Sequence, residues 1–183
     1  MVYVLTGASG SGKSEYAERL VCRLARERGI TEKIYLATME RSPGNAARIA
    51  RHRRQRAGRG FRTVEAPFGP ADGVLGTGRE RVILLECMSN LLANLVFSGG
   101  MPFGEARETI LSRIGELTEQ CLDLVIVTNE IFSDGNRYDG ETAAYIRTLG
   151  EINCRLAAAA DEFYEIVYSV PLCLKGERLP KKE

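Results

Sequence analysis

Short apolar runs alternate with longer amphipathic segments along most of the chain. The apolar runs are four to eight residues long, a length typical of buried strands. In the segments between them, apolar residues recur every three or four positions, which predicts helices that bury one face. We predict strands at residues 2–5, 33–38, 61–67, 81–86, 123–130 and 164–171, and helices at 13–28, 46–56, 88–97, 103–120 and 142–160.

This order of elements predicts an α/β domain with a mostly parallel sheet. Because helices separate the strands, neighbouring strands can run parallel through right-handed crossovers. Residues 69–79 contain four glycines and are expected to form a loop or weak helix, and 131–142 reads as a polar loop. The charged end, 177–183, is expected to fray. Without a repeat or a linker, residues 1–183 are expected to form one domain.

Composition changes this picture little but excludes several classes of protein. The net charge is +1 and 44% of the 183 residues are hydrophobic, as in a soluble globular domain. No apolar run approaches the roughly 20 residues that cross a bilayer, and the first residues do not resemble a signal peptide. The five cysteines form no C-x-x-C pair. We therefore expect reduced, packed cysteines in a cytoplasmic protein without a structural zinc site.

The segment GASGSGKS, residues 7–14, lies between the first predicted strand and the first predicted helix. It matches the phosphate-binding pattern G-x-x-x-x-G-K-[ST] through Gly7, Gly12, Lys13 and Ser14. Small residues let backbone N–H groups surround phosphate oxygens, and the helix N-terminus adds partial positive charge. Lys13 would contact the β- and γ-phosphates, and the Ser14 hydroxyl could bind Mg²⁺. An ordinary glycine-rich turn is the alternative, which the flanking strand and helix disfavour.

Polar side chains end two of the predicted strands. Glu86 ends the run VILLE, and Asn129 and Glu130 end the next strand along the chain. In an open parallel sheet, the ligand crevice lies at the carboxyl ends of the strands. Glu86 could therefore hold Mg²⁺ through water or bind another part of the ligand. A solvated carboxylate at a strand end is the alternative, and it has more weight for Asn129 and Glu130.

The only histidine, His52, lies in a strongly basic segment. Residues 41–62 contain eight arginines and no acidic residue. On a helix, Arg48, His52 and Arg56 share one face, flanked by Arg51 and Gln55. These arginines repel one another, so their arrangement makes sense if an anion lies beside them. Their positive charges also disfavour protonation of the imidazole. A neutral imidazole beside a phosphate chain could attack phosphorus, while the arginines stabilise a leaving pyrophosphate.

Other interpretations of this segment remain open. An arginine-rich helix is often merely solvated, and a single histidine is often incidental. The segment Arg41 to Arg62 could also bind nucleic acid. Against nucleic acid, Phe61 is the only aromatic residue available there for base stacking. We therefore expect no nucleic-acid partner.

Taken together, these motifs resemble those of the bifunctional adenosylcobinamide kinase/adenosylcobinamide-phosphate guanylyltransferases of cobalamin biosynthesis. The phosphate loop by itself is generic, whereas the R-I-x-x-H stretch followed by T-V-E and L-L-E-C is specific. The similarity covers almost the whole chain, through VLTGASGSGKSEYAE, YLAT, AARIARHRRQR, FRTVE, LLECMSNLLANLVF, VTNE and INCRLAAAADEFYEIVYSVPLCLK.

The resemblance implies a set of site residues. In this family the histidine of R-I-x-x-H carries GMP covalently, and His52 matches it; Lys13 would be the second catalytic residue. Ser14 would be a possible Mg²⁺ ligand, and Glu86 would contact either the nucleotide or Mg²⁺ through water. The nucleotide-binding positions that carry over are Gly7, Ala8, Ser9, Gly10, Ser11, Gly12, Lys13, Ser14, Thr38, Met39, Glu40, Arg53, Arg54, Gln55, Arg56, Glu65 and Glu86.

The resemblance also implies a P-loop-type fold, a homotrimer and two reactions. The first phosphorylates adenosylcobinamide with ATP or GTP; the second transfers GMP from GTP through His52 to give adenosylcobinamide-GDP. Two departures from the family pattern stand out: the loop IFSDGNRYDGET at 131–142 replaces a hydrophobic G-x-G-I-V-P type, and Ser169-Val170-Pro171 replaces Gly-x-Pro. The loop change could alter corrinoid binding or the kinase half. A simple small-molecule kinase without covalent nucleotide is the rival enzyme.

Overall fold

The computed structural model describes residues 1–69 and 78–176. A seven-stranded sheet has the order β3-β2-β4-β5-β1-β6-β7, and only β7 runs antiparallel to its neighbour. The strands are β1 (Val2–Thr6), β2 (Glu32–Ala37), β3 (Phe61–Glu65), β4 (Arg81–Glu86), β5 (Asp123–Val127), β6 (Glu162–Val167) and β7 (Val170–Lys175). The α-helices are α1 (Lys13–Glu27), α2 (Ala46–Arg56), α3 (Met88–Ala93), α4 (Phe103–Glu119) and α5 (Gly140–Ala159).

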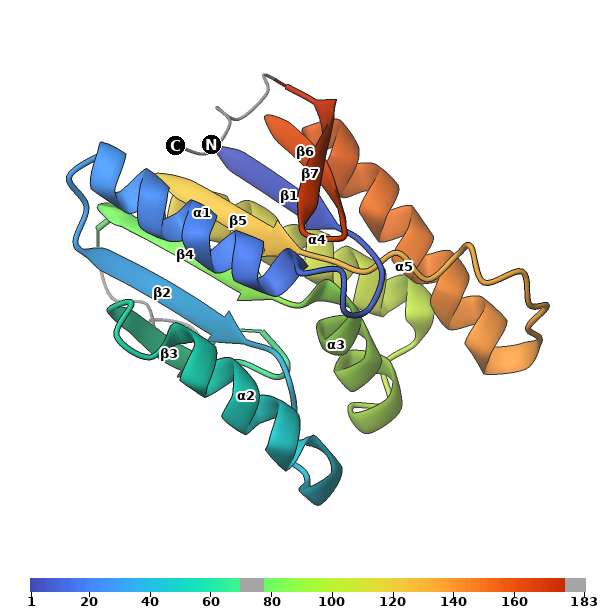
Figure 1. The fold of residues 1–183 in the computed structure, drawn as a ribbon. Coiled ribbons are helices and arrows are strands. Elements are labelled where there is room, and N and C mark those ends of the chain that lie inside the picture. Colours follow the sequence, from blue (N-terminus) through green and yellow to red (C-terminus); the bar gives the residue numbers. More distant parts are fainter. Residues whose placement is uncertain (70–77, 177–183) are drawn as a thin grey trace.

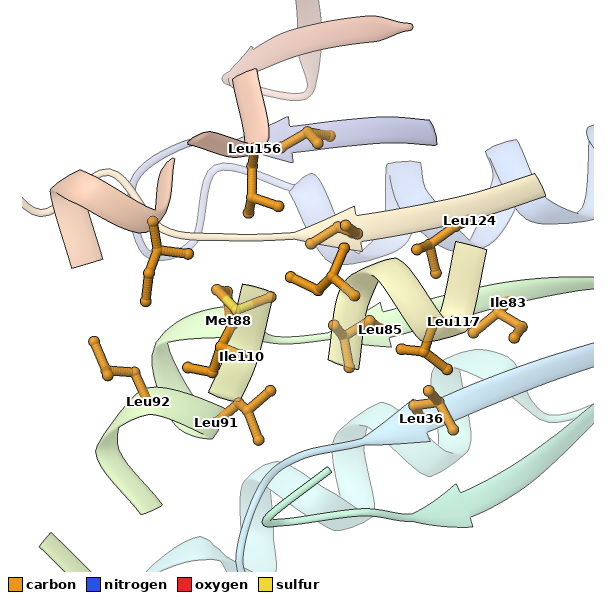
Figure 2. Packing of buried hydrophobic residues seen from close by; sticks show 14 of the residues in the cluster. Leu36, Ile83, Leu85, Met88, Leu91, Leu92, Ile110, Leu117, Leu124 and Leu156 are labelled. Atoms are coloured by element: carbon orange, nitrogen blue, oxygen red, sulfur yellow. The ribbon is translucent and has the colours of Figure 1, made fainter. Parts of the chain in front are cut away.

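Helices cover both faces of this sheet, as the alternation of strands and helices predicts (Figure 1). Strand β4 is buried over its whole length and divides its side chains between two cores. Val82 and Leu84 pack with α1 on one face. Ile83 and Leu85 pack with α3, α4 and α5 on the other (Figure 2). The predicted α/β fold with a mostly parallel sheet is confirmed, and its continuous apolar strands follow from burial on both faces.

The single strand predicted at 164–171 is wrong, because this segment forms a hairpin. Strand β6 ends at Val167, and Tyr168 and Ser169 make the turn in the left-handed conformation, with φ of 48° and 64°. Strand β7 then pairs antiparallel with β6. The turn packs on the phosphate loop, since the Ser169 N–H donates to the Ser11 carbonyl at 2.8 Å. The pattern of hydrophobic residues does not show where one strand ends and the next begins when the turn between them contains no glycine.

The helix predicted at 88–97 is present but changes its winding. Helix α3 continues into a π-helical segment, η2 (Asn94–Ser98). Asn94 is buried there, and its side-chain amide donates to the Thr38 carbonyl at 2.7 Å and the Pro67 carbonyl at 2.8 Å. A short 3₁₀ turn, η1 (Pro43–Asn45), precedes α2. Most of the segment expected as a loop or weak helix, 70–77, and the expected frayed end, 177–183, lie outside the described residues.

Candidate functional site

A cavity of about 320 Å³ lies where the carboxyl ends of the parallel strands meet α2. The phosphate loop forms one wall, because it connects β1 to the start of α1. Helix α2 forms the facing wall. The lining residues are Ser9, Gly10, Ser11, Gly12, Lys13, Ser14, Glu15, Tyr35, Ala37, Met39, Arg48, Ile49, Arg51, His52, Gln55, Arg56, Glu65, Glu86, Cys87, Asn90, Val127, Asn129 and Ile131.

The phosphate loop has the backbone that a glycine-rich cradle requires. Gly10 and Gly12 have φ of 78° and 90°, in the region that favours glycine. At Gly7 there is no space for a side chain, since a Cβ there would lie 2.5 Å from the Ile166 carbonyl oxygen. Lys13 bends back over the loop, and its Nζ donates to the Ala8 carbonyl at 2.9 Å. A phosphate oxygen could replace that carbonyl as the partner of Nζ.

Burial lowers the pKa of Lys13 and Arg48 lowers it further, whereas Glu86 opposes the shift. Glu86 lines the same cavity, so its carboxylate favours the ammonium form of Lys13. Lys13 therefore supplies a buried positive charge at the point where the loop would hold phosphates.

Glu86 ends β4 and directs its carboxylate into the cavity. The Ser14 hydroxyl donates to Glu86 Oε1. Glu86 Oε2 is buried and has no hydrogen-bond partner among the residues that the structure describes. A hydroxyl and a carboxylate in contact are hard oxygen donors of the kind that Mg²⁺ prefers. This pair therefore fits the Mg²⁺ site expected at Ser14 and Glu86.

His52 lies on the opposite wall and faces the same carboxylate. Its side chain is 12% exposed, and its Nδ1 lies 4.0 Å from Glu86 Oε1. Burial is the largest cause of the lowered pKa of His52, and Arg51, Arg48 and Arg56 lower it further, while Glu86 opposes them. The sequence predicted this direction from the arginines alone. The imidazole is therefore neutral at pH 7, with its ring in the cavity.

Arg56 fixes the carboxyl end of α2 to the sheet. Its guanidinium carbon lies 3.9 Å from the centre of the Tyr35 ring, and its Nε donates to Thr63 Oγ1 at 3.1 Å. Arg56 is buried although it is charged. Stacking on an aromatic ring offsets part of the cost of removing an arginine from water. Arg56 thus lines the cavity and also holds α2 in place.

The other arginines of residues 41–62 are mostly paired within the protein. Arg41 and Arg53 both bind Glu65 Oε1, at 3.1 Å and 2.7 Å. Burial raises the pKa of Glu65, but the two arginines outweigh it and the net shift is downward. Arg59 pairs with Glu18, and Arg62 with Glu32. The basic segment is therefore no open strip of free cations, an arrangement that disfavours the nucleic-acid interpretation.

Not all expected site residues reach the cavity. The residues expected to bind nucleotide that do not line it are Gly7, Ala8, Thr38, Glu40, Arg53 and Arg54.

Thr38 and Glu40 are held by contacts outside the cavity. Thr38 is buried, accepts from the Cys87 N–H at 2.6 Å and donates to the Cys87 carbonyl at 2.8 Å. Glu40 accepts from Ser98 Oγ at 2.8 Å. The first contact joins the ends of β2 and β4, and the second joins the segment after β2 to η2. The role of both residues in nucleotide binding stays a prediction.

Sequence reasoning missed several lining residues. Tyr35 lies in the middle of a buried strand and Asn90 on a helix, so no local signal marks either as part of a site. Asn129 lines the cavity, as its place at a strand end suggested. Glu130 does not, because its carboxylate turns into the following loop and accepts from the Phe132 N–H at 2.8 Å.

Within the described part of the chain, no helix combines the length and hydropathy that crossing a membrane requires.

A family model described as "Cobinamide kinase / cobinamide phosphate guanyltransferase" matches residues 3–174.

Relatives of similar length are named as bifunctional proteins of adenosylcobalamin biosynthesis. The bifunctional adenosylcobalamin biosynthesis protein CobU of Salmonella typhimurium is 30% identical, over 96% of this chain and 100% of the relative. The bifunctional adenosylcobalamin biosynthesis protein CobP of Pseudomonas aeruginosa is 29% identical, over 96% and 98%. Among solved structures, the flagellar accessory protein FlaH of Methanocaldococcus jannaschii is similar at 14% identity with a TM-score of 0.48, over 96% of this chain and 78% of that chain.

Proposed function

The chain belongs to the cobinamide kinase / cobinamide phosphate guanyltransferase family, and we propose that it phosphorylates adenosylcobinamide and then guanylylates the product through a covalent GMP–His52 intermediate. The family gives the role in cobalamin biosynthesis. The proposal adds the order of the steps, the nucleophile and the residues that act on each phosphate. The observation that carries it is that His52 and the phosphate loop line one cavity from opposite walls.

In the kinase step, the substrate hydroxyl attacks the γ-phosphorus of ATP or GTP. The new O–P bond forms as the bond between the γ-phosphorus and the bridging oxygen breaks, which releases the nucleoside diphosphate and a proton. Lys13 and the loop N–H groups stabilise the negative charge on the transferred group. Mg²⁺ held by Ser14 and Glu86 would supply further neutralising charge on the phosphate oxygens.

In the guanylylation step, an imidazole nitrogen of His52 attacks the α-phosphorus of GTP. A P–N bond forms, the bond from the α-phosphorus to the bridging oxygen breaks, and pyrophosphate leaves. Glu86 lies nearest Nδ1, so it favours the tautomer that carries its proton on Nδ1 and leaves the Nε2 lone pair free. Arg48 and Arg51 on the same wall stabilise the leaving pyrophosphate.

The second half of guanylylation returns His52 to its free state. A phosphate oxygen of adenosylcobinamide phosphate attacks the same phosphorus, and the P–N bond breaks. The product is adenosylcobinamide-GDP, in which two phosphates join the corrinoid to guanosine. A cavity of about 320 Å³ suits a nucleotide and the end of a substrate side chain, so the corrin ring would remain outside. Assembly as a homotrimer and a cytoplasmic location belong to the same proposal.

The test is incubation with GTP labelled at the α-phosphate, followed by denaturation. We expect label on the wild-type protein that survives alkali and is lost in acid, as a phosphoramidate is, and none on a His52→Asn variant. If the wild type acquires no label but phosphorylates cobinamide, the protein is a simple kinase. If His52→Asn labels as well as the wild type, another residue carries the nucleotide.

A further inference from the structure

The helix that carries His52 is held against the protein by unusually little apolar packing. Arg56 is the only buried residue of α2, a helix that the structure describes in full. Helix α1, in contrast, buries Ala17, Leu20 and Val21 among others. The position of an ordinary surface helix is set by its apolar stripe. Charged contacts near the carboxyl end of α2 must therefore do much of this work.

Glu18 is a buried carboxylate that the proposed chemistry does not use. It lies on α1 one helical turn after Ser14, and its side chain is 0% exposed. Its Oε2 accepts a hydrogen bond from Arg59 Nη1 at 2.9 Å. Its Oε1 is buried and has no partner within the described residues. A buried carboxylate with half of its oxygens unpaired is a poor source of stability, since desolvation costs more than one ion pair returns.

Arg59 belongs to the turn between α2 and β3. Its N–H donates to the Arg56 carbonyl at 3.1 Å, and Gly58 and Gly60 on either side have φ of 77° and 72°. The contact between Arg59 and Glu18 therefore ties the end of α2 to the helix that begins at the phosphate loop. His52 lies one helical turn before Arg56, roughly 6 Å along the axis. A change in the direction of α2 at this turn moves His52 relative to the loop.

We propose that Glu18 and Arg59 form a latch that positions His52 over the phosphate loop. The latch means the hydrogen bond from Arg59 Nη1 to Glu18 Oε2. Glu18 acts through Arg59 and α2, so it is a positioning residue and not a catalytic one. The inference rests on the proposed function, because it explains how the proposed nucleophile is held near the nucleotide.

The charges around Glu18 are consistent with this role. Burial raises the pKa of Glu18 to about 7; Arg59 and Arg56 oppose this shift, while Glu86 and Glu15 add to it. A carboxylate that resists ionisation in the folded protein does not stabilise it at neutral pH. Replacing Glu18 with leucine removes the acceptor of Arg59, so it should open the latch while it leaves the fold intact.

The first measurement uses the fact that His52 is the only histidine. Its imidazole gives one proton resonance set, and titrating that set by NMR reports the pKa of His52 in the full chain without any ligand. In Glu18→Leu we expect this pKa to rise toward the ordinary value, since burial is the largest cause of its depression. Loss of a nearby negative charge would by itself lower the pKa of a histidine. A rise therefore identifies movement of α2.

Three further variants serve as controls for the measurement. Glu27→Gln removes an exposed carboxylate from the same helix and should leave the titration of His52 unchanged. Arg59→Lys keeps a cation at the turn and should restore much of the depressed pKa that Arg59→Met loses. If the titration of His52 in Glu18→Leu is unchanged or shifts downward while the protein remains folded, there is no latch.

An activity measurement then links the latch to guanylylation. We expect Glu18→Leu to slow GMP labelling of His52 at saturating GTP by roughly tenfold, with a smaller effect on the kinase step, which does not use His52. A wild-type protein that takes no label overturns the proposed function, whereas the titration still decides the latch. Equal loss of both activities would assign Glu18 to the phosphate loop itself and contradict the positioning role.

Discussion

The Nδ1 atom of His52 lies 4.0 Å from Oε1 of Glu86. The two residues come from opposite walls of the cavity, one from α2 and the other from the end of β4. The same carboxylate oxygen accepts a hydrogen bond from Ser14. Glu86 thus joins the phosphate loop to the proposed nucleophile, so a single substitution there should affect both.

Replacing Glu86 with glutamine should slow GMP labelling of His52 by on the order of 100-fold, because the imidazole loses the group that orients it and selects its tautomer. The measurement is the rate of label incorporation from GTP labelled at the α-phosphate. Glu130→Gln is the matched control, since Glu130 also follows a strand but lies outside the cavity. Equal rates in Glu86→Gln and wild type would contradict the assigned role.

The lowered pKa of His52 predicts that guanylylation persists into mildly acidic solution. Histidine is a nucleophile only when neutral, and its folded pKa lies below the ordinary 6.5. The half-maximum of labelling should therefore lie below pH 6.5. Rapid-quench labelling across pH 5 to 8 measures this profile. A half-maximum at or above pH 6.5 would mean that the imidazole is not desolvated in the working enzyme.

The lowered pKa of His52 also makes the stability of the protein depend on pH. Because the folded pKa of His52 is depressed, the unfolded chain binds a proton first as pH falls through about 6.5. The neutral buried imidazole therefore costs stability below that pH and none above it. The loss of free energy of unfolding between pH 7.5 and 5.5, measured in urea, should be smaller in His52→Gln than in wild type. An equal loss would place the imidazole in solvent.

Arg56→Ala should lower the free energy of unfolding by about 1–3 kcal/mol. The variant loses the stacking on Tyr35 and leaves Thr63 without its partner. Urea denaturation followed by circular dichroism checks this. Arg54→Ala is the comparison, an exposed arginine of the same helix whose removal should change stability by less than about 0.5 kcal/mol. Similar free energies of unfolding for the two variants would show that the stacking of Arg56 on Tyr35 does not stabilise the protein.

Gly7→Ala should abolish nucleotide binding, because its Cβ would lie 2.5 Å from the Ile166 carbonyl oxygen and the backbone φ of 152° is unfavourable for alanine. Fluorescent GTP titration measures the effect. Gly115→Ala is the control: it lies within α4 with no atom near its Cβ position, and it should stabilise the protein by about 0.5–1 kcal/mol. Normal nucleotide affinity in Gly7→Ala would contradict the geometry of the loop.

Local sequence patterns predicted the elements well where one signal dominated. Strand β4 runs from Arg81 to Glu86 as predicted, because an unbroken apolar run has few alternatives. The hairpin of β6 and β7 was missed, because Tyr168 and Ser169 are not residues that usually occupy a left-handed turn. Their conformation is supported by packing on the phosphate loop, a contact between the two ends of the chain.

Some residues of the candidate site could be predicted from the sequence and others could not. The cradle of residues 7–14 is contiguous, so its spacing alone indicates phosphate binding. Tyr35 and Glu18 carry no such signal, since a tyrosine in a strand and a glutamate on a helix are ordinary. Only the fold brings the ring of Tyr35 under Arg56 and the carboxylate of Glu18 to Arg59.

The sequence by itself determined the order of strands and helices up to β6, the phosphate cradle and the family motifs, because each of these depends on residues that are close together in the chain. Tertiary structure alone decided that His52 faces Glu86 and that most arginines of 41–62 are bound to partners within the protein. Those contacts join residues from different elements, and their distances depend on how the sheet and α2 pack. Local propensity and periodicity act over a few residues, whereas packing acts over the whole domain.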